Sequence, residues 1–249
     1  MGVKSYLTLL KNEGKLSVRD MNMIIFSIAM PLVVLVVLGI IYGVKPAVPG
    51  ADHTFLEQSF GAVCGISMCA GGLMGLPIVV SDYRERKILK RFQVTPMSPM
   101  LLLIVELSIY IFYCVISLLL CGVAATVFWR VQLRENGLAF FGSWLLTMLS
   151  TLSIGLLVGG AAKNSKQASV IACILYFPML IFSGTTVPLE ILPKAMQAAV
   201  RFFPFTMGVA LMKETFLGIV AENAVGTVGV MIGVTVFCTA LAAKLFKWE

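Results

Sequence analysis

The sequence predicts an all-α integral membrane protein with six transmembrane helices, and its composition and the length of its apolar segments carry this prediction. Hydrophobic residues make up 59% of the 249 residues, charged residues only 12%, and the mean hydropathy is +0.97. A soluble domain has about a quarter of its residues charged, so this chain cannot cover itself with a polar surface. Strand-like alternation over segments of about ten residues does not recur, which argues against a β-barrel.

The expected spans follow from segment length, because a helix needs roughly 20 apolar residues to cross the hydrocarbon core. They are residues 21–42, 58–80, 100–129, 138–162, 168–183 and 224–243. The third is long for one crossing and the fifth is short. The first twenty residues are too polar for a cleaved signal peptide, which has an early apolar core, so we expect the first span to be retained.

The basic residues predict the orientation. With six spans, both termini lie on one side, and 13 of the 19 Lys and Arg residues fall on that side against 6 on the other. Cytoplasmic loops carry such an excess, so we expect a multi-pass protein with both termini in the cytoplasm. The net charge of +7 then reflects this bias, and nucleic acid is not an expected partner.

The sequence gives little support for a catalytic function. The six cysteines lie within the expected spans without a C-x-x-C pair, as packing residues do, and metal sites need clustered ligands. The single histidine, His53, falls in an expected outer loop. A phosphate-binding G-x-x-x-x-G-K-[ST] pattern is absent. We therefore expect no catalytic, cofactor or metal site here, and any ATP hydrolysis must occur in another chain.

Glu106 is the only acidic residue well inside an expected span. An ionisable residue within a membrane helix is a candidate substrate or ion site. Glu106 lies only about 10 Å from the start of its span at 1.5 Å per residue. Pairing with the neighbouring basic segment, or snorkelling to the interface, is therefore the alternative interpretation, and the one we favour.

Glycines repeat in the small-x-x-x-small pattern that lets helix backbones approach closely in lipid. The pairs are Gly61 with Gly65, Gly71 with Gly75, Gly155 with Gly159, and Gly229 with Gly233. This pattern predicts close packing within the bundle or at a subunit interface.

Two segments outside the spans are amphipathic. In "YRERKILKRFQVTPMSP", Ile88, Leu89 and Phe92 share one helical face, while the basic residues follow another. This pattern predicts a short helix over residues 83–95, stopped by Pro96. Apolar residues also recur at helical spacing over residues 189–217, which predicts two short outer helices on either side of Pro204.

In sequence order, these features resemble the permeases of type-2 ABC exporters, the membrane subunits of transporters driven by separate ATPases. "SYLTLLKNEGKL" resembles their N-terminal interfacial elbow helix (residues 3–17), and "YRERKILKRFQVTPMSP" resembles their coupling segment. "FSGTTVPLEILPKAMQAAVRFFPFTMGVALMK" resembles the run between their last two spans. Met207 stands where the family often has tyrosine, which bears on the subfamily.

The resemblance implies a plasma-membrane protein, most simply a bacterial one, in which two permease chains, identical or homologous, bind two ATPase subunits that hold ATP and Mg. The ATPase-coupling residues would be Arg84, Glu85, Lys87, Ile88, Leu89, Arg91, Phe92, Thr95 and Pro96. The outer gate would comprise Gly184, Pro188, Glu190, Leu192, Pro193, Pro204 and Phe205.

The sequence indicates the substrate less directly than it indicates the family. Spans rich in Met and Phe suit varied apolar ligands, so we expect export of an amphiphilic drug, antibiotic or lipid-like molecule. Polysaccharide or ion export within the same family is the alternative. A secondary transporter that works without an ATPase is the competing class, although such proteins usually carry ionisable groups at the membrane midplane.

Overall fold

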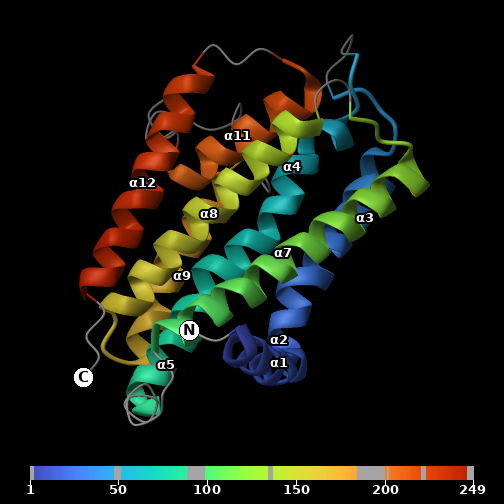
Figure 1. Cartoon of the computed structure of the whole chain (residues 1–249). Helices are drawn as coiled ribbons and strands as arrows, with labels where there is room; N and C mark the ends of the chain where they lie inside the picture. Colours follow the sequence, from blue (N-terminus) through green and yellow to red (C-terminus); the bar gives the residue numbers. More distant parts are fainter. Residues whose placement is uncertain are drawn as a thin grey trace.

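The structure, a computed structural model, describes residues 3–47, 52–88, 99–133, 137–183, 200, 202–219 and 223–245. These residues form helices (Figure 1), and within them the only strand-like pairing is a single bridge between Pro46 and Thr54. The expected all-α class is therefore confirmed for the part of the chain that the structure describes.

The described elements are helices and follow one another in chain order. They are α1 (Val3–Arg19), α2 (Met21–Ile24), η1 (Ile25–Ala29), α3 (Met30–Tyr42), α4 (Phe55–Met68), η2 (Cys69–Gly75), α5 (Leu76–Glu85), α7 (Pro99–Trp129), α8 (Gly137–Ala161), α9 (Ser165–Ile181), α11 (Pro204–Leu217) and α12 (Ala224–Leu245). The π-helical segments η1 and η2 join their neighbours into continuous helical runs.

Five helical runs are long and apolar enough to cross a membrane. They are Met21–Tyr42, Phe55–Glu85, Met100–Trp129, Gly137–Ala161 and Ala224–Leu245. The expected fifth span instead corresponds to α9, whose 17 residues extend about 25 Å at 1.5 Å per residue. That length is shorter than the roughly 30 Å hydrocarbon core, so five runs, and not six, meet the length criterion among the described residues.

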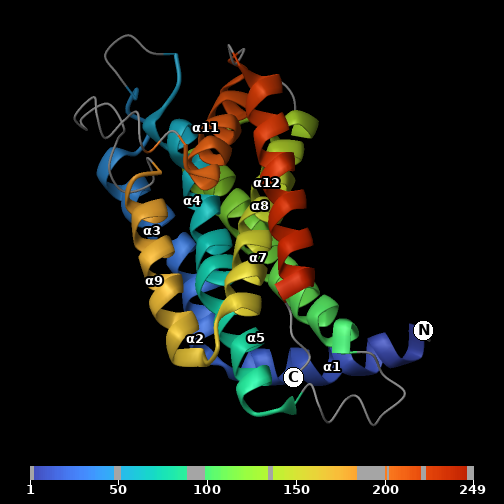
Figure 2. The same cartoon turned by 90° about the vertical axis from the view of Figure 1, so that its left-hand side faces the viewer.

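The bundle has two distinct ends. We call basal the end that holds α1, the last turn of α5, the α8–α9 connection and the end of α12; it is the lower end in Figure 1. The apical end holds the Pro46–Thr54 bridge and the start of α12. Figure 2 shows α1 lying across the basal end, roughly perpendicular to the helices of the bundle, as an interfacial helix would.

The run α4–η2–α5 forms the centre of the bundle. In its most apolar stretch 83% of the residues are buried, against 22% for the first run and 11% for α12. Helices α3 and α7 pack on one side of it, and α8, α9 and α11 on the other. Near the apical end, Phe60, Phe140 and Phe216 from three of these helices have ring centroids 5.0 to 5.9 Å apart, the spacing of favourable aromatic pairs.

Both π-helical segments end just before a proline. Pro31 is the second residue of α3 and Pro77 the second residue of α5. Proline has no backbone N–H and its ring clashes with the carbonyl four residues earlier, so a regular α-helical ladder is interrupted there. No sequence pattern predicted these segments, and the second span, expected to end at residue 80, continues as a helix to Glu85.

Close packing occurs at three of the four glycine pairs. At Gly155 an added Cβ would lie 1.8 Å from the carbonyl oxygen of Gly72, so α8 touches the backbone of η2 directly. At Gly61 it would lie 2.8 Å from Cβ of Met212 in α11. At Gly229 and Gly233, by contrast, an added Cβ would meet nothing within 4 Å, so this pair packs against no described part of the chain.

Candidate functional site

The start of the predicted coupling helix differs from expectation. Residues 83–85 are the last turn of α5, and the helix ends there. The N–H of Lys87 donates to the carbonyl of Arg84 at 3.0 Å, and Lys87 has φ 55°, a left-handed conformation typical of a helix terminus. Residues 83–85 of the predicted helix therefore belong to the end of the central run, while residues 89–95 lie outside the described residues.

Of the predicted coupling residues, the structure describes four. Arg84 is half-buried, Glu85 and Lys87 are exposed, and Ile88 is half-buried against the core. The other predicted coupling residues, Leu89, Arg91, Phe92, Thr95 and Pro96, lie outside the described residues.

Arg84 contacts the end of α8. Its Nη1 donates a hydrogen bond of 2.9 Å to the carbonyl oxygen of Gly160, one of the last residues of that helix. The final carbonyls of a helix lack partners within it and carry partial negative charge, so a guanidinium group is well suited to this position.

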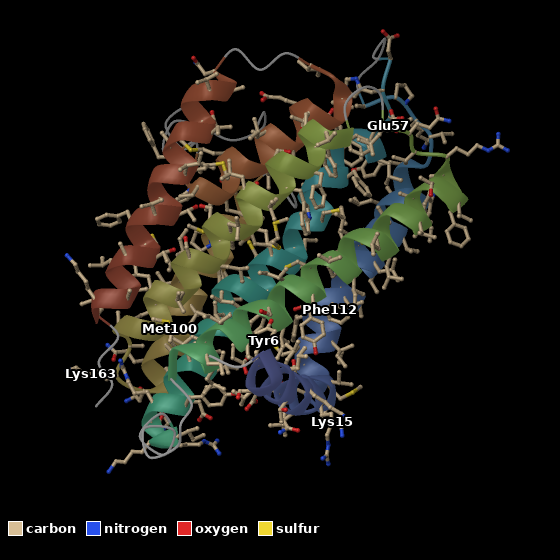
Figure 3. All side chains as sticks on the ribbon, in the orientation of Figure 1. Tyr6, Lys15, Glu57, Met100, Phe112 and Lys163 are labelled. Carbon is tan, nitrogen blue, oxygen red and sulfur yellow. The ribbon has the colours of Figure 1, made fainter. Side chains whose placement is uncertain are left out.

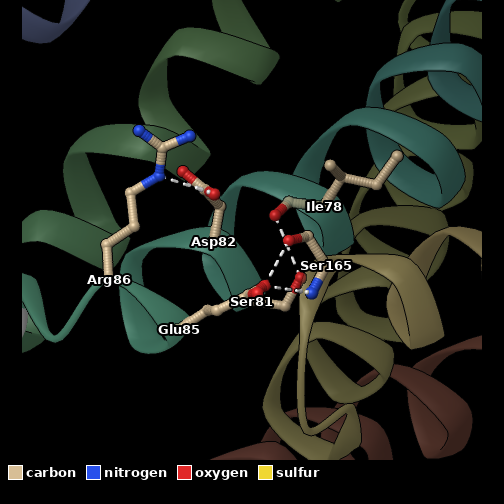
Figure 4. Close-up of polar contacts among 6 residues, drawn as sticks. All are labelled: Ile78, Ser81, Asp82, Glu85, Arg86 and Ser165. Atoms are coloured by element: carbon tan, nitrogen blue, oxygen red, sulfur yellow. Dashed lines mark hydrogen bonds and ion pairs between the residues drawn. The ribbon is translucent and has the colours of Figure 1, made fainter.

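Glu85 contacts the start of α9. Its Oε2 accepts hydrogen bonds from the backbone N–H of Ser165 at 2.9 Å and from the Ser165 hydroxyl at 2.5 Å, as Figure 4 shows. The first N–H groups of a helix carry partial positive charge and favour a carboxylate. Asn164 caps the same terminus through a 2.8 Å bond to the N–H of Gln167.

Adjacent residues of α5 thus hold two helices at once: the cation meets the negative end of α8, and the anion meets the positive end of α9. We call this arrangement, formed by Arg84, Glu85, Gly160 and Ser165, the basal clamp. It fixes the end of the central run to the α8–α9 connection. Displacement of residues 86 onwards would therefore act on α8 and α9 as well as on α5.

Arg86 pairs within its own helix. Its Nε lies 2.8 Å from Oδ1 of Asp82, four residues earlier (Figure 4). The arginine side chain is 70% exposed, and exposed pairs of this kind contribute about 0.3–0.5 kcal/mol. Unlike the basal clamp, this pair joins no separate elements.

A second polar cluster joins α1, α5 and α7 near the basal clamp. The hydroxyl of Tyr83 lies 2.9 Å from Oε2 of Glu13 and 2.9 Å from Oε1 of Glu106. A phenol has one proton to donate, so the second contact requires a proton on one of the two carboxyl groups. Glu106 is buried in this junction, towards the basal end of α7, and its described contact with the charged stretch is made by Tyr83.

Five of the seven predicted outer-gate residues are not among those that the structure describes. Gly184, Pro188, Glu190, Leu192 and Pro193 lie outside the described residues.

The two predicted gate residues that the structure describes are the first two residues of α11. Pro204 is its first residue, where the missing N–H costs nothing. Phe205 is buried, and its Cζ lies 2.7 Å from where an added Cβ of Gly65 in α4 would be. The Phe205 side chain therefore packs inside the bundle and does not face solvent at the apical end.

Sequence reasoning missed the partners of the charged residues. Gly160, Ser165, Glu13 and Tyr83 were not singled out, since they are far from their partners along the chain or lack a recognisable motif. One signal was available: "NSKQ" from Asn164 is typical of a helix start with an Asn N-cap, which would have placed the N-terminus of α9 correctly.

At the basal end, hydrogen bonds connect α5 to the end of α8 and to the start of α9. Within the described ranges no group of three or more His, Cys, Asp or Glu side chains is placed to hold a metal ion. The charged groups of the basal clamp bind backbone groups and a hydroxyl of the same chain. The arrangement can transmit a displacement between helices.

Comparison with known proteins places the chain in a family. The model of the family "ABC-2 type transporter" matches residues 4–217. The chain is 25% identical over 187 residues to a probable multidrug ABC transporter permease, YbhS, of Escherichia coli K12 and equally to that of strain O157:H7. Each match covers 75% of this chain and 48% of the relative, so the chain spans about half the length of these relatives. The chain belongs to the ABC-2 type transporter family.

Proposed function

We propose that this chain is the membrane subunit of an ATP-driven exporter, that its basal end faces the cytoplasm, and that a separate ATPase binds there. The observation that carries the proposal is the basal clamp, because it ties the end of the buried central run to α8 and α9. The residues that follow it, 86–95, complete the basic amphipathic segment, residues 83–95, that the family resemblance assigns to ATPase binding.

The basal clamp is suited to transmit a movement of α5 to α8 and α9. A hydrogen bond with an ionised partner is shorter and stronger than a neutral one, and the clamp has one to each neighbouring helix. Movement of residues 86–95 by an ATPase would therefore shift α5, α8 and α9 together. Since α5 belongs to the buried central run and α8 and α9 pack against it, such a movement would open and close a path through the bundle.

The orientation rests on charge. The basal end carries the cations of α1, the charged end of α5 and the lysines near the start of α9, consistent with the excess of basic residues expected on a cytoplasmic face. We further propose two permease chains, identical or homologous, and two ATPase subunits that hold ATP and Mg. In this proposal ATP binds in those subunits.

The substrate we propose is an amphiphilic drug, antibiotic or lipid-like molecule. The relatives described as multidrug permeases support this class, as do the Met and Phe residues of the spans. Polysaccharide or ion export is the alternative within the family. A secondary transporter is less well supported, because Glu106 lies in the first turns of α7, at a junction with α1 and α5.

Replacing Phe92, on the apolar face of the basic segment, tests the proposal. Loss of one large buried side chain costs about 3–5 kcal/mol, enough to weaken ATPase binding by two or three orders of magnitude. Phe92→Asp should therefore abolish co-purification of the ATPase or uncouple its ATP hydrolysis from export. Lys87→Gln is the matched control and should have little effect, since one exposed charge among several is screened.

The assay co-expresses the chain with its ATPase and measures pull-down, vanadate-sensitive ATPase activity and efflux. If Phe92→Asp binds the ATPase and exports at the parental rate, the segment does not couple the two subunits and the proposal fails. Export by the chain without any ATPase would support the secondary-transporter class instead.

A further inference from the structure

A groove runs between α1 and α7 at the basal end, with a cavity volume of about 730 Å³. Its apolar lining comes from Leu10 and Val18 of α1 and from Ile109 and Phe112 of α7. Phe112 is 61% exposed, and Figure 3 shows it on α7 above the elbow helix that carries Lys15. Because α7 is one of the membrane-spanning runs, the upper part of this groove opens towards lipid.

Two hydroxyl pairs fix α1 against α7. The hydroxyl of Tyr6 donates to Oγ of Ser108 at 2.8 Å, and Oγ of Ser17 lies 2.8 Å from the hydroxyl of Tyr113. The two pairs are about three helical turns apart along α1. They hold the elbow at a fixed distance from the span, so the groove between them is a stable feature of the packed chain.

Three cations line the groove on one face of α1. Lys11, Lys15 and Arg19 follow one another at intervals of four residues, one per turn, and all three are exposed. Within the part of the chain that the structure describes, none of them forms a salt bridge; the one described salt bridge is elsewhere, in α5. Like charges four residues apart repel each other, so this row of cations favours an anionic partner.

Gly14 keeps the middle of the groove open. It lies within α1 and lines the groove, and a Cβ added there would meet nothing within 4 Å. Its φ is not in the left-handed region, so the backbone does not require glycine. Glycine lowers helix propensity, and what its presence provides here is free volume between the cations and the apolar floor.

We propose that this groove binds an anionic phospholipid. The phosphate would lie against Lys11, Lys15 and Arg19, and an acyl chain would follow the apolar surface of Ile109 and Phe112. Lys and Arg stems lie along apolar surface while their charged ends reach the headgroup region, and basic residues at this depth attract anionic lipids. A lipid, and not a soluble protein, is the expected occupant because the floor of the groove belongs to a membrane-spanning helix.

The lipid is expected to carry net negative charge. A zwitterionic lipid offers the same acyl chains, but its own cationic group offsets the phosphate, so it gains less from three cations. The inference depends on neither the ATPase partnership nor the direction of transport. Its failure would leave the proposed function untouched.

Native mass spectrometry of the detergent-solubilised chain, titrated with phosphatidylglycerol or phosphatidylcholine, tests the charge requirement. Each basic residue near a lipid surface strengthens binding by about a factor of five. The triple variant Lys11→Gln, Lys15→Gln and Arg19→Gln should therefore bind phosphatidylglycerol about 100-fold more weakly, close to the level of phosphatidylcholine. The parental chain should retain one phosphatidylglycerol well above that level.

The matched control removes the same charge elsewhere at the basal end. Lys163, Lys166 and Lys244 are all exposed there, and their joint replacement by Gln should leave the binding of phosphatidylglycerol unchanged. An equal loss of binding in both triple variants would mean a non-specific effect of net charge, and the proposed site would be wrong.

A steric variant tests the groove itself. Gly14→Leu keeps every charge and fills the open volume, so it should reduce retention of phosphatidylglycerol at least tenfold. Gly137→Leu, at the opposite end of the bundle and also with nothing within 4 Å of an added Cβ, should have no effect. Unchanged binding by Gly14→Leu, or by the Lys11, Lys15 and Arg19 triple variant, would overturn the proposal.

Discussion

Gly155 is the position where one added methyl group should cost the bundle most. In Gly155→Ala the new Cβ would lie 1.8 Å from the carbonyl oxygen of Gly72, whereas a carbon–oxygen contact normally needs about 3.3 Å. The helices would have to separate by about 1.5 Å along that direction. Overpacking typically costs about 1–3 kcal/mol, and the upper value applies here because both contacting groups belong to the backbone.

A gain in helix propensity partly offsets this cost. Alanine stabilises a helix interior by about 0.5–1 kcal/mol relative to glycine, which leaves a net loss of about 2 kcal/mol. At about 2–4 °C per kcal/mol for a chain of this size, the Tm in detergent should fall by about 4–8 °C. Thermal melting followed by fluorescence-detected size exclusion would measure it.

Gly142 of the same helix provides the control. An added Cβ there meets nothing within 4 Å, so Gly142→Ala should gain the propensity term alone and raise the Tm by about 1–4 °C. If Gly155→Ala melts at or above the temperature of Gly142→Ala, then α8 does not touch the η2 backbone as described, and the reasoning on close packing is refuted.

Two further predictions concern the basal polar cluster and the orientation. Tyr83→Phe removes the hydroxyl shared by Glu13 and Glu106, and loss of a hydrogen bond to a charged group costs about 1.5–3 kcal/mol. It should therefore lower the Tm by about 3–12 °C, and unchanged melting would contradict the bridging role. In intact cells, a membrane-impermeant maleimide should label His53→Cys and spare Lys87→Cys, with the parental chain as background; the reverse pattern would overturn the proposed orientation.

The first run illustrates what one sequence can predict about the fold. Its limits, 21–42, coincide with the helical run that the structure places there, because hydropathy decides both. The second run is longer than predicted because polar residues extend it: Ser81 is fully buried and donates to the carbonyl of Ile78 at 3.0 Å. Hydropathy cannot recognise polar residues whose partners lie inside the bundle.

The candidate site shows the same limit more sharply. The sequence drew attention to Arg84 and Glu85 as charged residues at a coupling segment, yet it could not predict their contacts with Gly160 and Ser165. These partners lie 76 and 80 residues away along the chain, and one sequence contains no record of such pairings. Phe205 is a parallel case: the pattern placed it on an outer helix, but not in the buried contact with α4.

Transport stoichiometry in variants of the basal clamp tests the proposed coupling most directly. Glu85→Gln and Ser165→Ala should each lower the number of substrate molecules exported per ATP, because the first removes the charge of the clamp and the second removes one of the two hydrogen bonds that Glu85 accepts. ATPase co-purification should stay at the parental level, and Arg86→Gln, whose partner Asp82 lies in its own helix, should export normally. If Glu85→Gln exports at the parental ratio, or if it loses the ATPase altogether, the clamp does not transmit the ATPase's movement to α8 and α9.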